Sequence, residues 1–187
     1  MDAGPLPQKL FIAFDVPKEA YAFHATVHKA IAGPHTYARK HLTPPHITVK
    51  APMLVSATQA SDIHDALCDL VDTGKVARFA VELGEINMFT KSGALYLSVD
   101  GGAIRPQMFT IIHALASMGF ARGFYEGLVP HITLAKAHKW NRFSLRQVIE
   151  GLDGRPRGEF MIERLRIFTR YGMSSGEWNT SEILDLR

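Results

Sequence analysis

The sequence contains a single cysteine, Cys68, among 187 residues. One thiol cannot form a disulfide within the chain, so a fold held by disulfides is excluded; the apolar helical pattern around Cys68 indicates a small buried side chain rather than a nucleophile. No apolar run approaches the roughly 18 residues that a membrane-spanning helix needs. Residues 1–8 (MDAGPLPQ) lack the basic start and apolar stretch of a signal peptide. We therefore predict a cytoplasmic protein without membrane contact, with a loose segment at residues 1–8.

A large excess of charge of one sign is also missing. The chain has 21 Lys and Arg against 18 Asp and Glu, which gives a net charge of +3. This mildly basic balance is compatible with a phosphate-bearing ligand, but it does not require a nucleic acid. A hydrophobic content of 47% and the lack of low-complexity tracts are typical of a folded domain. We expect one folding unit over residues 1–187, and a monomer.

The sequence carries one short motif twice. PPHITVK occupies residues 44–50, and VPHITLAK occupies residues 129–136, with the histidines eighty-five positions apart. A single His-x-Thr would mean little, because short motifs occur by chance. Two copies that share the preceding proline and the central isoleucine indicate an internal duplication.

The duplication extends beyond the motif. At the same offset Leu10–Asp15 falls on Leu95–Asp100, and both segments are predicted to be short strands followed by amphipathic helices. A second helix is expected after each motif, because Ser56 and Ser144 each begin the Ser-x-x-Gln form of a capping box. Further strands are expected at Val76–Leu83, Ile162–Thr169 and Ile183–Leu186. The repeat units are about 9–84 and 94–187, and a duplicated unit suggests a pseudo-twofold axis with a cleft between the halves.

Strand geometry decides what the two motifs present. Side chains alternate along a strand, so His46 and Thr48 share one face, and His131 and Thr133 do the same in the second copy. Two imidazoles with ordinary pKa values near 6.5 can divide acid and base roles at neutral pH, as phosphodiester chemistry requires. The threonine hydroxyls can donate hydrogen bonds to phosphate oxygens as negative charge develops there. This chemistry needs no metal.

These residues resemble the 2H phosphoesterase superfamily, which is named for two His-x-Thr/Ser motifs, and they are most similar to its 2′-5′ RNA ligase-like (LigT-like) members. The resemblance covers most of the chain from Leu10 onward. It implies a bilobal α+β fold, in which two antiparallel sheets flanked by helices face a central cleft. It also implies hydrolysis or formation of 2′,3′-cyclic phosphate or 2′,5′ linkages in nucleotides or RNA ends, without a cofactor. Carried over by position, the catalytic residues are His46, Thr48, His131 and Thr133.

Five further residues are candidates for binding the substrate. Lys50 shares the alternating face of the first motif and is expected either to reach a phosphate or to be a solvated lysine at a strand end. Phe89 and Lys91 belong to a loop predicted over residues 87–93, where stacking on a base competes with ordinary loop packing. Arg170 and Tyr171 end a predicted strand and are expected to offer a guanidinium and a ring to a nucleotide.

Three classes of function stay open from the sequence. The first is a metal-independent phosphodiesterase, which alone requires both histidines and both threonines. The second is a nucleotide- or RNA-binding module that kept the cleft without turnover. The third is a zinc hydrolase using His46, His131 and a further ligand.

His24 and His28 have a four-residue spacing that can bind zinc, but they lack the glutamate of His-Glu-x-x-His, so we expect exposed helix histidines.

Overall fold

The structure is a computed structural model, which describes residues 7–31, 38–39, 44–120, 128–137, 142–171 and 178–187. Helices and strands mix throughout these residues, which confirms the predicted α+β class. The helices are α1 (Lys18–Ile31), α2 (Ala57–Asp72), α3 (Ile104–Ser117) and α4 (Arg142–Glu150). The strands are β1 (Gln8–Phe14), β2 (Ala38–Arg39), β3 (Ile47–Val55), β4 (Phe79–Phe89), β5 (Ala94–Asp100), β6 (His131–Ala137), β7 (Gly158–Ile162), β8 (Arg164–Tyr171) and β9 (Asn179–Asp185). Within the described residues, none of the helices combines the length and the hydrophobicity that a membrane span requires.

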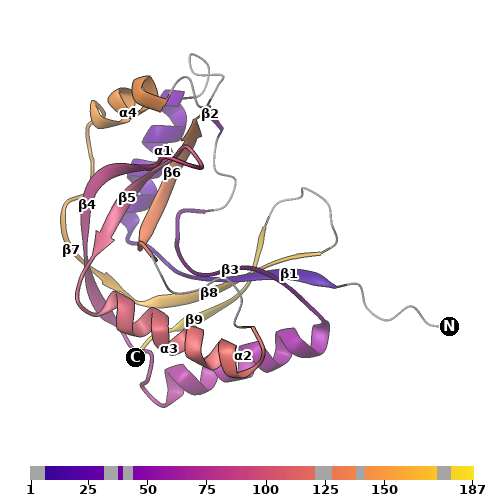
Figure 1. Cartoon of the computed structure of the whole chain (residues 1–187). Coiled ribbons are helices and arrows are strands. Elements are labelled where there is room, and N and C mark those ends of the chain that lie inside the picture. The colour runs from indigo at the N-terminus through magenta and orange to yellow at the C-terminus, as the bar shows by residue number, and fades with distance from the viewer. Residues whose placement is uncertain (1–6, 32–37, 40–43, 121–127, 138–141, 172–177) are drawn as a thin grey trace.

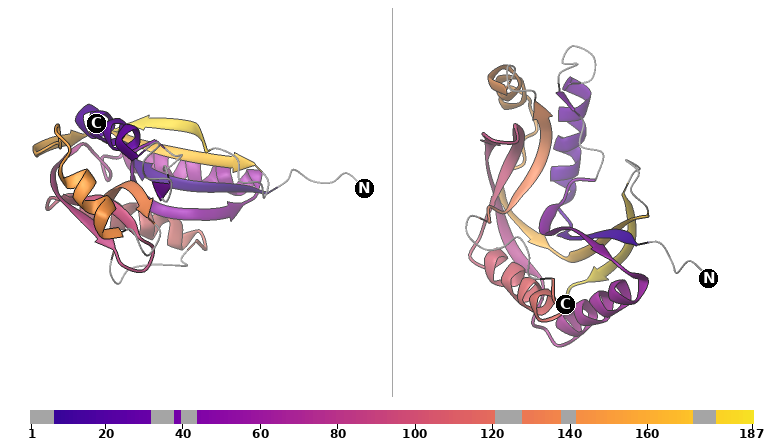
Figure 2. Two further views of the ribbon diagram at one scale, coloured as in Figure 1. Left: turned by 90° about the horizontal axis from the view of Figure 1, so that it is seen from above. Right: turned by 45° about the vertical axis from the view of Figure 1, so that its right-hand side comes forward.

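The strands form one curled antiparallel sheet whose order is symmetric about its centre. The order is β7-β4-β5-β6-β3-β1-β8-β9, with β2 paired to β6. We call β3, β1, β8 and β9 the β1 half, and β6, β5, β4 and β7 the β5 half. Ile47 of β3 pairs with Ile132 of β6, and this is the one pair that joins the halves in the described part of the sheet. The ribbons of the halves splay apart from this junction (Figures 1 and 2).

The two repeat units are interleaved. β4 follows the first motif along the chain, yet it pairs with β5; β8 follows the second motif, yet it pairs with β1. The helices are exchanged in the same way, because α1 packs on β6 and α3 packs on β3. In Figure 1, α2 and α3 lie beneath the β1 half, and α1 and α4 lie beside the β5 half. Each half of the sheet is therefore built from both units.

The pairing register corrects the alignment predicted between the first strands. Thr48 is opposite Ala13, and Thr133 is opposite Tyr96, so Ala13 corresponds to Tyr96 at an offset of 83. The predicted offset of 85 holds for the motif strands but is wrong by two residues here. A shift of two keeps every side chain on its predicted face, because strands have a period of two.

The local signals are confirmed at some positions and wrong at others. Ser56 caps α2 with the full reciprocal capping box, as predicted. Ser144 does not open a helix, because α4 already begins at Arg142. The strand predicted over Val76–Leu83 begins at Phe79 and continues to Phe89, so the first part of the expected loop is strand.

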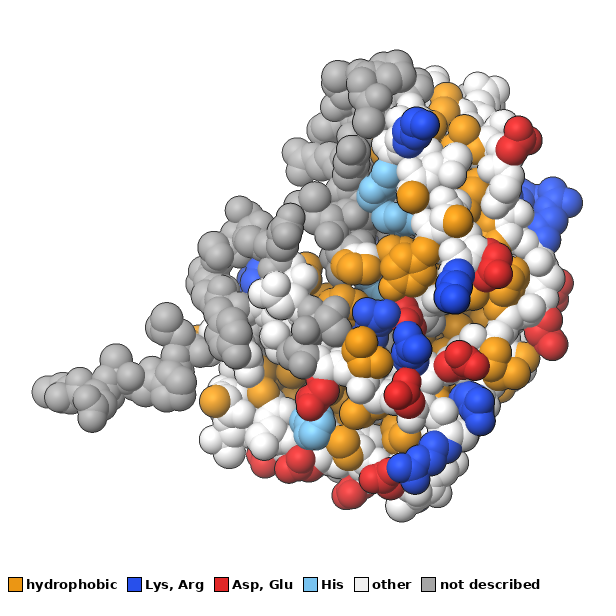
Figure 3. All heavy atoms as spheres, turned by 180° about the vertical axis from the view of Figure 1, so that it is seen from behind, with side chains coloured by type: hydrophobic (Ala, Val, Ile, Leu, Met, Phe, Trp, Pro, Cys, Tyr) orange, Lys and Arg blue, Asp and Glu red, His pale blue; other side chains and the backbone are white. Residues whose placement is uncertain are grey.

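The open face of the β1 half has a small aromatic core of its own. The main core lies under the helices, where β1 contributes Leu10, Ile12 and Phe14. The alternate residues Phe11 and Ala13 pack with Phe168 of β8 on the other face, and Trp178 packs against them. Over the surface drawn in Figure 3, basic and acidic side chains are interspersed rather than gathered into a patch of one sign, in keeping with the small net charge.

Candidate active site

The pair between Ile47 and Ile132 places the two motifs side by side. Both isoleucines are fully buried in the main core. In an antiparallel ladder the residues that flank such a pair are opposite each other, so His46 lies across from Thr133, and Thr48 lies across from His131. Alternation turns these four side chains to the face opposite the isoleucines. His46 is 9% exposed, whereas the other three are half-buried.

The backbone fixes the tautomer of both imidazoles. Nδ1 of His46 lies 2.7 Å from the carbonyl oxygen of Pro44, and Nδ1 of His131 lies 2.8 Å from that of Val129. A carbonyl oxygen can only accept, so Nδ1 carries the hydrogen in both rings. Proton exchange is therefore confined to Nε2 in each histidine.

Each histidine is packed against a pair of stacked aromatic rings. Phe11 and Phe168 stack with ring centroids 4.4 Å apart, and the ring of His46 lies 5.1 Å from the first and 5.7 Å from the second. Phe89 and Tyr96 stack at 4.2 Å, and the ring of His131 lies 4.8 Å and 5.3 Å from them. These rings limit how far either imidazole can turn and keep its Nε2 pointing in one direction.

The charge state of His131 follows from its surroundings. Burial disfavours the imidazolium and lowers the pKa of His131 from 6.5, and the hydrogen bond to the Val129 carbonyl opposes this only in part. His131 is therefore neutral at pH 7, with Nε2 as an acceptor.

A β-bulge removes Lys50 from the motif face, and this corrects the prediction that it shares the face of His46 and Thr48. Thr48 is opposite Ala13, but Lys50 is opposite Ile12, so one extra residue lies in β3 at this point. A bulge redirects the side chain beside it. Lys50 is 3% exposed, and its ammonium donates a hydrogen bond of 2.8 Å to the carbonyl oxygen of Phe120, after α3. It is neither on the motif face nor a solvated lysine.

The same bulge occurs in the second motif. Thr133 is opposite Tyr96, but Ala135 is opposite Leu95. Ala135 is fully buried at the position that corresponds to Lys50. Alternation alone therefore fails after the threonine in both copies of the motif.

The remaining predicted binding residues lie on both halves. Phe89 ends β4 and contacts His131, whereas Lys91 is exposed in the turn that follows. Arg170 lies on β8, with its guanidinium carbon 4.8 Å from the ring centroid of Trp178. The backbone of Tyr171 ends β8, and its side chain lies outside the described residues.

A second internal repeat identifies a residue that the sequence analysis missed. Residues 87–93 read NMFTKSG and residues 166–172 read RIFTRYG, so both contain Phe-Thr-(Lys or Arg)-x-Gly. Phe89 pairs with Ala94 of β5, and Phe168 pairs with Phe11 of β1. The two partners, Phe11 and Ala94, are 83 residues apart, which is the offset that relates β1 to β5. Phe168 is thus the counterpart of Phe89, and it contacts His46 as Phe89 contacts His131.

The histidines on α1 are not the exposed pair that we expected. His24 is only 6% exposed, and its ring centroid lies 3.9 Å from that of His28. Nε2 of His28 lies 3.2 Å from the carbonyl oxygen of Leu134, at the bulge of β6. Across the described parts of the chain, no three His, Cys, Asp or Glu side chains are grouped as ligands for a metal ion.

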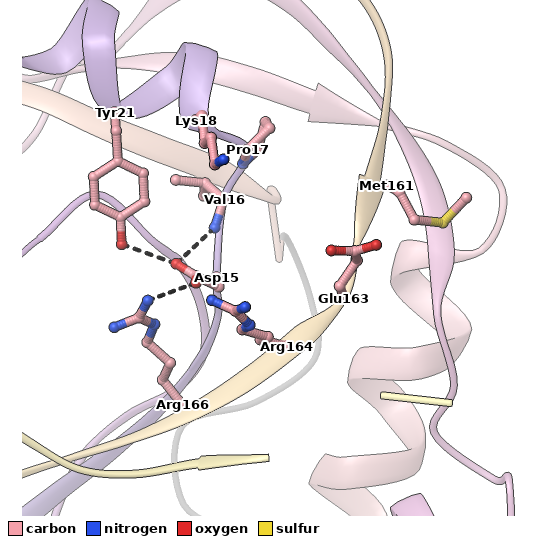
Figure 4. Close-up of a pocket in the computed structure, with 9 residues that line it drawn as sticks. All are labelled: Asp15, Val16, Pro17, Lys18, Tyr21, Met161, Glu163, Arg164 and Arg166. Carbon is pink, nitrogen blue, oxygen red and sulfur yellow. Dashed lines mark hydrogen bonds and ion pairs between the residues drawn. The ribbon is translucent and has the colours of Figure 1, made fainter. Parts of the chain in front are cut away.

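A polar pocket lies where the start of α1 meets β1 and β8 (Figure 4). Oδ1 of Asp15 accepts a hydrogen bond of 2.9 Å from the Tyr21 hydroxyl, and Oδ2 lies 2.6 Å from Nη2 of Arg166. Burial, and then the hydrogen bond to Asp15, raise the pKa of Tyr21 to about 12. Because α1 packs on β6, this network braces the β1 half against the β5 half.

Comparison with known proteins identifies a family. A family model described as the 2′-5′ RNA ligase superfamily matches residues 16–173. No curated protein matches the chain.

Several solved structures share the fold. E. coli LigT, solved with 3′-AMP, is 20% identical with a TM-score of 0.61 over 96% of this chain and 98% of that one. A protein of Thermus thermophilus is 16% identical with a TM-score of 0.64 over the same shares of the two chains. The PDE domain of MHV ns2 is 16% identical with a TM-score of 0.54, and the match covers 70% of this chain and 79% of that one.

Proposed function

The chain belongs to the 2′-5′ RNA ligase superfamily, and from that premise we propose that it is a metal-independent phosphodiesterase acting on 2′,3′-cyclic phosphates or 2′,5′-linked nucleotides or RNA ends. The observation that carries the proposal is the pairing of Ile47 with Ile132. This pair sets two histidines of fixed tautomer, each beside a threonine of the other motif, on one face of the sheet.

His131 acts as the general base and His46 as the general acid. Neutral His131 takes the proton of the attacking water or hydroxyl on Nε2 while that oxygen forms its bond to phosphorus. As the bond from phosphorus to the leaving oxygen breaks, Nε2 of His46 gives that oxygen its proton. The lowered pKa of His131 supports this assignment, because a base must be neutral before the reaction begins. Each proton transfer contributes roughly 10² to 10⁴ in rate.

Thr48 and Thr133 hold the phosphate between the two imidazoles. Their hydroxyls lie on the same face as the histidines and donate to the non-bridging oxygens, on which negative charge grows in the transition state. Loss of one such donor costs about 3 kcal/mol of transition-state stabilisation.

The solved complexes of LigT support a nucleotide as substrate. That protein has been solved with 3′-AMP, NADP+ and ATP, each of which contains a phosphate linked to a nucleoside. The aromatic rings beside both histidines suit a ligand that combines an anionic phosphate with apolar ring systems.

A panel of substrates in chelator-treated buffer tests the proposal. It contains 2′,3′-cyclic mononucleotides, 2′,5′-linked dinucleotides and RNA ending in a cyclic phosphate. We expect turnover of at least one substrate class that excess chelator does not reduce. His46→Ala and His131→Ala should each lower turnover at least a hundredfold, whereas His113→Ala, on the exposed side of α3, should not. Binding without turnover of any substrate would replace the enzyme with the binding module, and loss of activity in chelator would favour the zinc hydrolase.

A further inference from the structure

A second pocket lies on the helix-covered face of the β1 half, away from the His-x-Thr motifs. It has a volume of about 290 Å³ and is bounded by β1, β8, β9 and the first half of α2; we call it the α2 pocket. Leu10 and Ile167 in its wall belong to the main core, whereas Phe168, the neighbour of Ile167, points to the opposite face and contacts His46. The sheet therefore separates the α2 pocket from the motifs, and α2 covers it from beneath (Figure 1).

A buried acceptor that lacks a donor lines the α2 pocket. Gln8 is 7% exposed, and its amide oxygen, Oε1, has no hydrogen-bond donor in the part of the chain that the structure describes. Leaving such an atom unpaired is unfavourable, and most buried polar atoms in proteins have a partner. The backbone of Gln8 is paired with strands on both sides, so its side chain stays on this face. A ligand that brings an N–H group to this oxygen removes the cost.

The rest of the polar wall favours a cation. Glu182 of β9 carries a carboxylate that can accept from several donors, and its Oε2 lies 3.1 Å from Nε2 of His64 on α2. Thr169 is 8% exposed and offers a hydroxyl oxygen. No lysine or arginine is among the described residues that line the pocket. Three exposed aspartates lie beside it on one side of α2, spaced by three and four residues: Asp62, Asp65 and Asp69.

The size and the apolar walls limit the ligand to a small molecule with an alkyl body. A volume of 290 Å³ is that of about ten waters, at roughly 30 Å³ each. Leu10, Ala60 and Ile167 line the pocket with apolar surface. We infer that the α2 pocket binds a small aliphatic diamine. One ammonium donates to Oε1 of Gln8, the methylenes contact the apolar walls, and the other ammonium is held by Glu182 and the aspartates of α2.

Calorimetric titration of the full chain with 1,4-diaminobutane tests the inference. We expect saturable binding with a Kd of about 1 mM or tighter at low salt. Butylamine, which has one ammonium, should bind about tenfold more weakly, and 1-butanol, which has none, should bind more weakly still. Added salt should weaken the diamine most, because the exposed carboxylates are screened. No saturable binding of the diamine up to about 10 mM, or equal affinity for 1-butanol, would overturn the inference.

Variants assign the contacts to side chains. Gln8→Met keeps the length of the side chain but removes the unpaired oxygen, so it should retain its stability in urea and bind the diamine about tenfold more weakly. Glu182→Gln should weaken binding by a similar factor, and because this side chain is 46% exposed, the variant should fold. Glu159→Gln, which removes an exposed carboxylate from β7 in the β5 half, is the matched control and should bind as the wild type does.

Two results from these variants would contradict the assignment. Wild-type affinity in both Gln8→Met and Glu182→Gln would show that the diamine does not occupy the α2 pocket. Equal weakening by Glu159→Gln and Glu182→Gln would show that it is held by the general charge of the protein. Either result overturns the inference.

Two further titrations separate this inference from its alternatives. His46→Ala should bind the diamine as the wild type does, whatever its turnover, so the inference stands or falls independently of the proposed function. Loss of diamine binding in His46→Ala would move the amine to the motif face and overturn the inference. Acetyl-lysine methylamide, with a free side-chain ammonium, should bind no more tightly than butylamine. Tighter binding than the diamine would indicate a lysine of a protein partner instead.

Discussion

The ring of Phe89 meets the ring of His131 nearly at a right angle, with centroids 4.8 Å apart and planes at 80°. Phe89 comes from β4, a strand that follows the first motif, yet its partner belongs to the second motif. Phe168 of β8 makes the reciprocal contact with His46 of the first motif. The interleaving of the repeat units therefore supplies each histidine with an aromatic support from a distant part of the chain.

Loss of either supporting ring should weaken catalysis without unfolding the protein. We expect Phe89→Leu and Phe168→Leu each to lower kcat by up to about tenfold, because an aromatic contact contributes about 1 kcal/mol to holding its partner. Phe160→Leu, a half-buried phenylalanine on β7, is the matched control and should leave kcat unchanged. Steady-state kinetics with any substrate that the wild type cleaves give the comparison, and equal losses in all three variants would contradict it.

Lys50 should affect stability rather than substrate binding. Its burial lowers the pKa of its ammonium, which donates a hydrogen bond to the carbonyl oxygen of Phe120. Lys50→Met keeps the length of the side chain and should change kcat/KM less than twofold, with about 1 kcal/mol lost from the hydrogen bond. Lys50→Ala also leaves a cavity and should cost about 3 kcal/mol in urea unfolding. A large rise in KM for Lys50→Met at unchanged stability would return Lys50 to the substrate site.

The ion pair beneath α1 should be costly to break from one side. Arg166 and Asp15 have side chains only 17% and 12% exposed, so Arg166→Met leaves a largely buried carboxylate without its cation. We expect a loss of about 3 kcal/mol in the free energy of unfolding. Arg164 lies on the same strand as Arg166 and forms an exposed ion pair with Asp185 of β9. Arg164→Met breaks that pair and should lower the free energy of unfolding by less than about 1 kcal/mol.

A second variant separates charge burial from packing. Adding Asp15→Asn to Arg166→Met removes the unpaired carboxylate charge and should recover part of the lost free energy of unfolding. If the double variant is no more stable than the single one, the cost arises from packing instead.

His131 should titrate below the ordinary pKa of histidine. Its pKa is lowered by burial, so the folded state binds the proton less tightly than the unfolded state does. The stability associated with neutral His131 is complete above pH 6.5, and it is lost as the pH falls through the folded pKa. NMR titration should give a midpoint below 6.5, and His131→Gln should lose less stability than the wild type on acidification. A midpoint above 6.5 would reverse the assignment of base and acid.

The duplicated His-x-Thr motif is visible in the sequence because both copies read Pro-His-Ile-Thr. Alternation correctly put Ile47 and Ile132 in the core. It failed at Lys50, since a bulge depends on how β3 meets β1 and leaves no signal within the strand. The exchange of β4 and β8 between the halves could not be predicted from the sequence either, because local patterns do not specify which strands pair.

The role of Phe168 as the counterpart of Phe89 could have been predicted from the sequence. The repeat of Phe-Thr-(Lys or Arg)-x-Gly is as regular as the histidine motif, but its offset of 79 differs from 85, so a search at one fixed shift misses it. Trp178 gave no such signal, because its place beside Phe11 depends on the pairing of β8 with β1.

The pH dependence of kcat/KM in chelator-treated buffer tests paired-histidine catalysis most directly. Paired-histidine catalysis predicts that kcat/KM rises and then falls between about pH 5 and 8.5. Both apparent pKa values in this profile belong to the pair His46 and His131. His131→Ala should remove the rising limb and His46→Ala the falling limb, each with at least a hundredfold loss at the optimum. A single rising limb that both variants retain, or that chelator abolishes, would contradict the account.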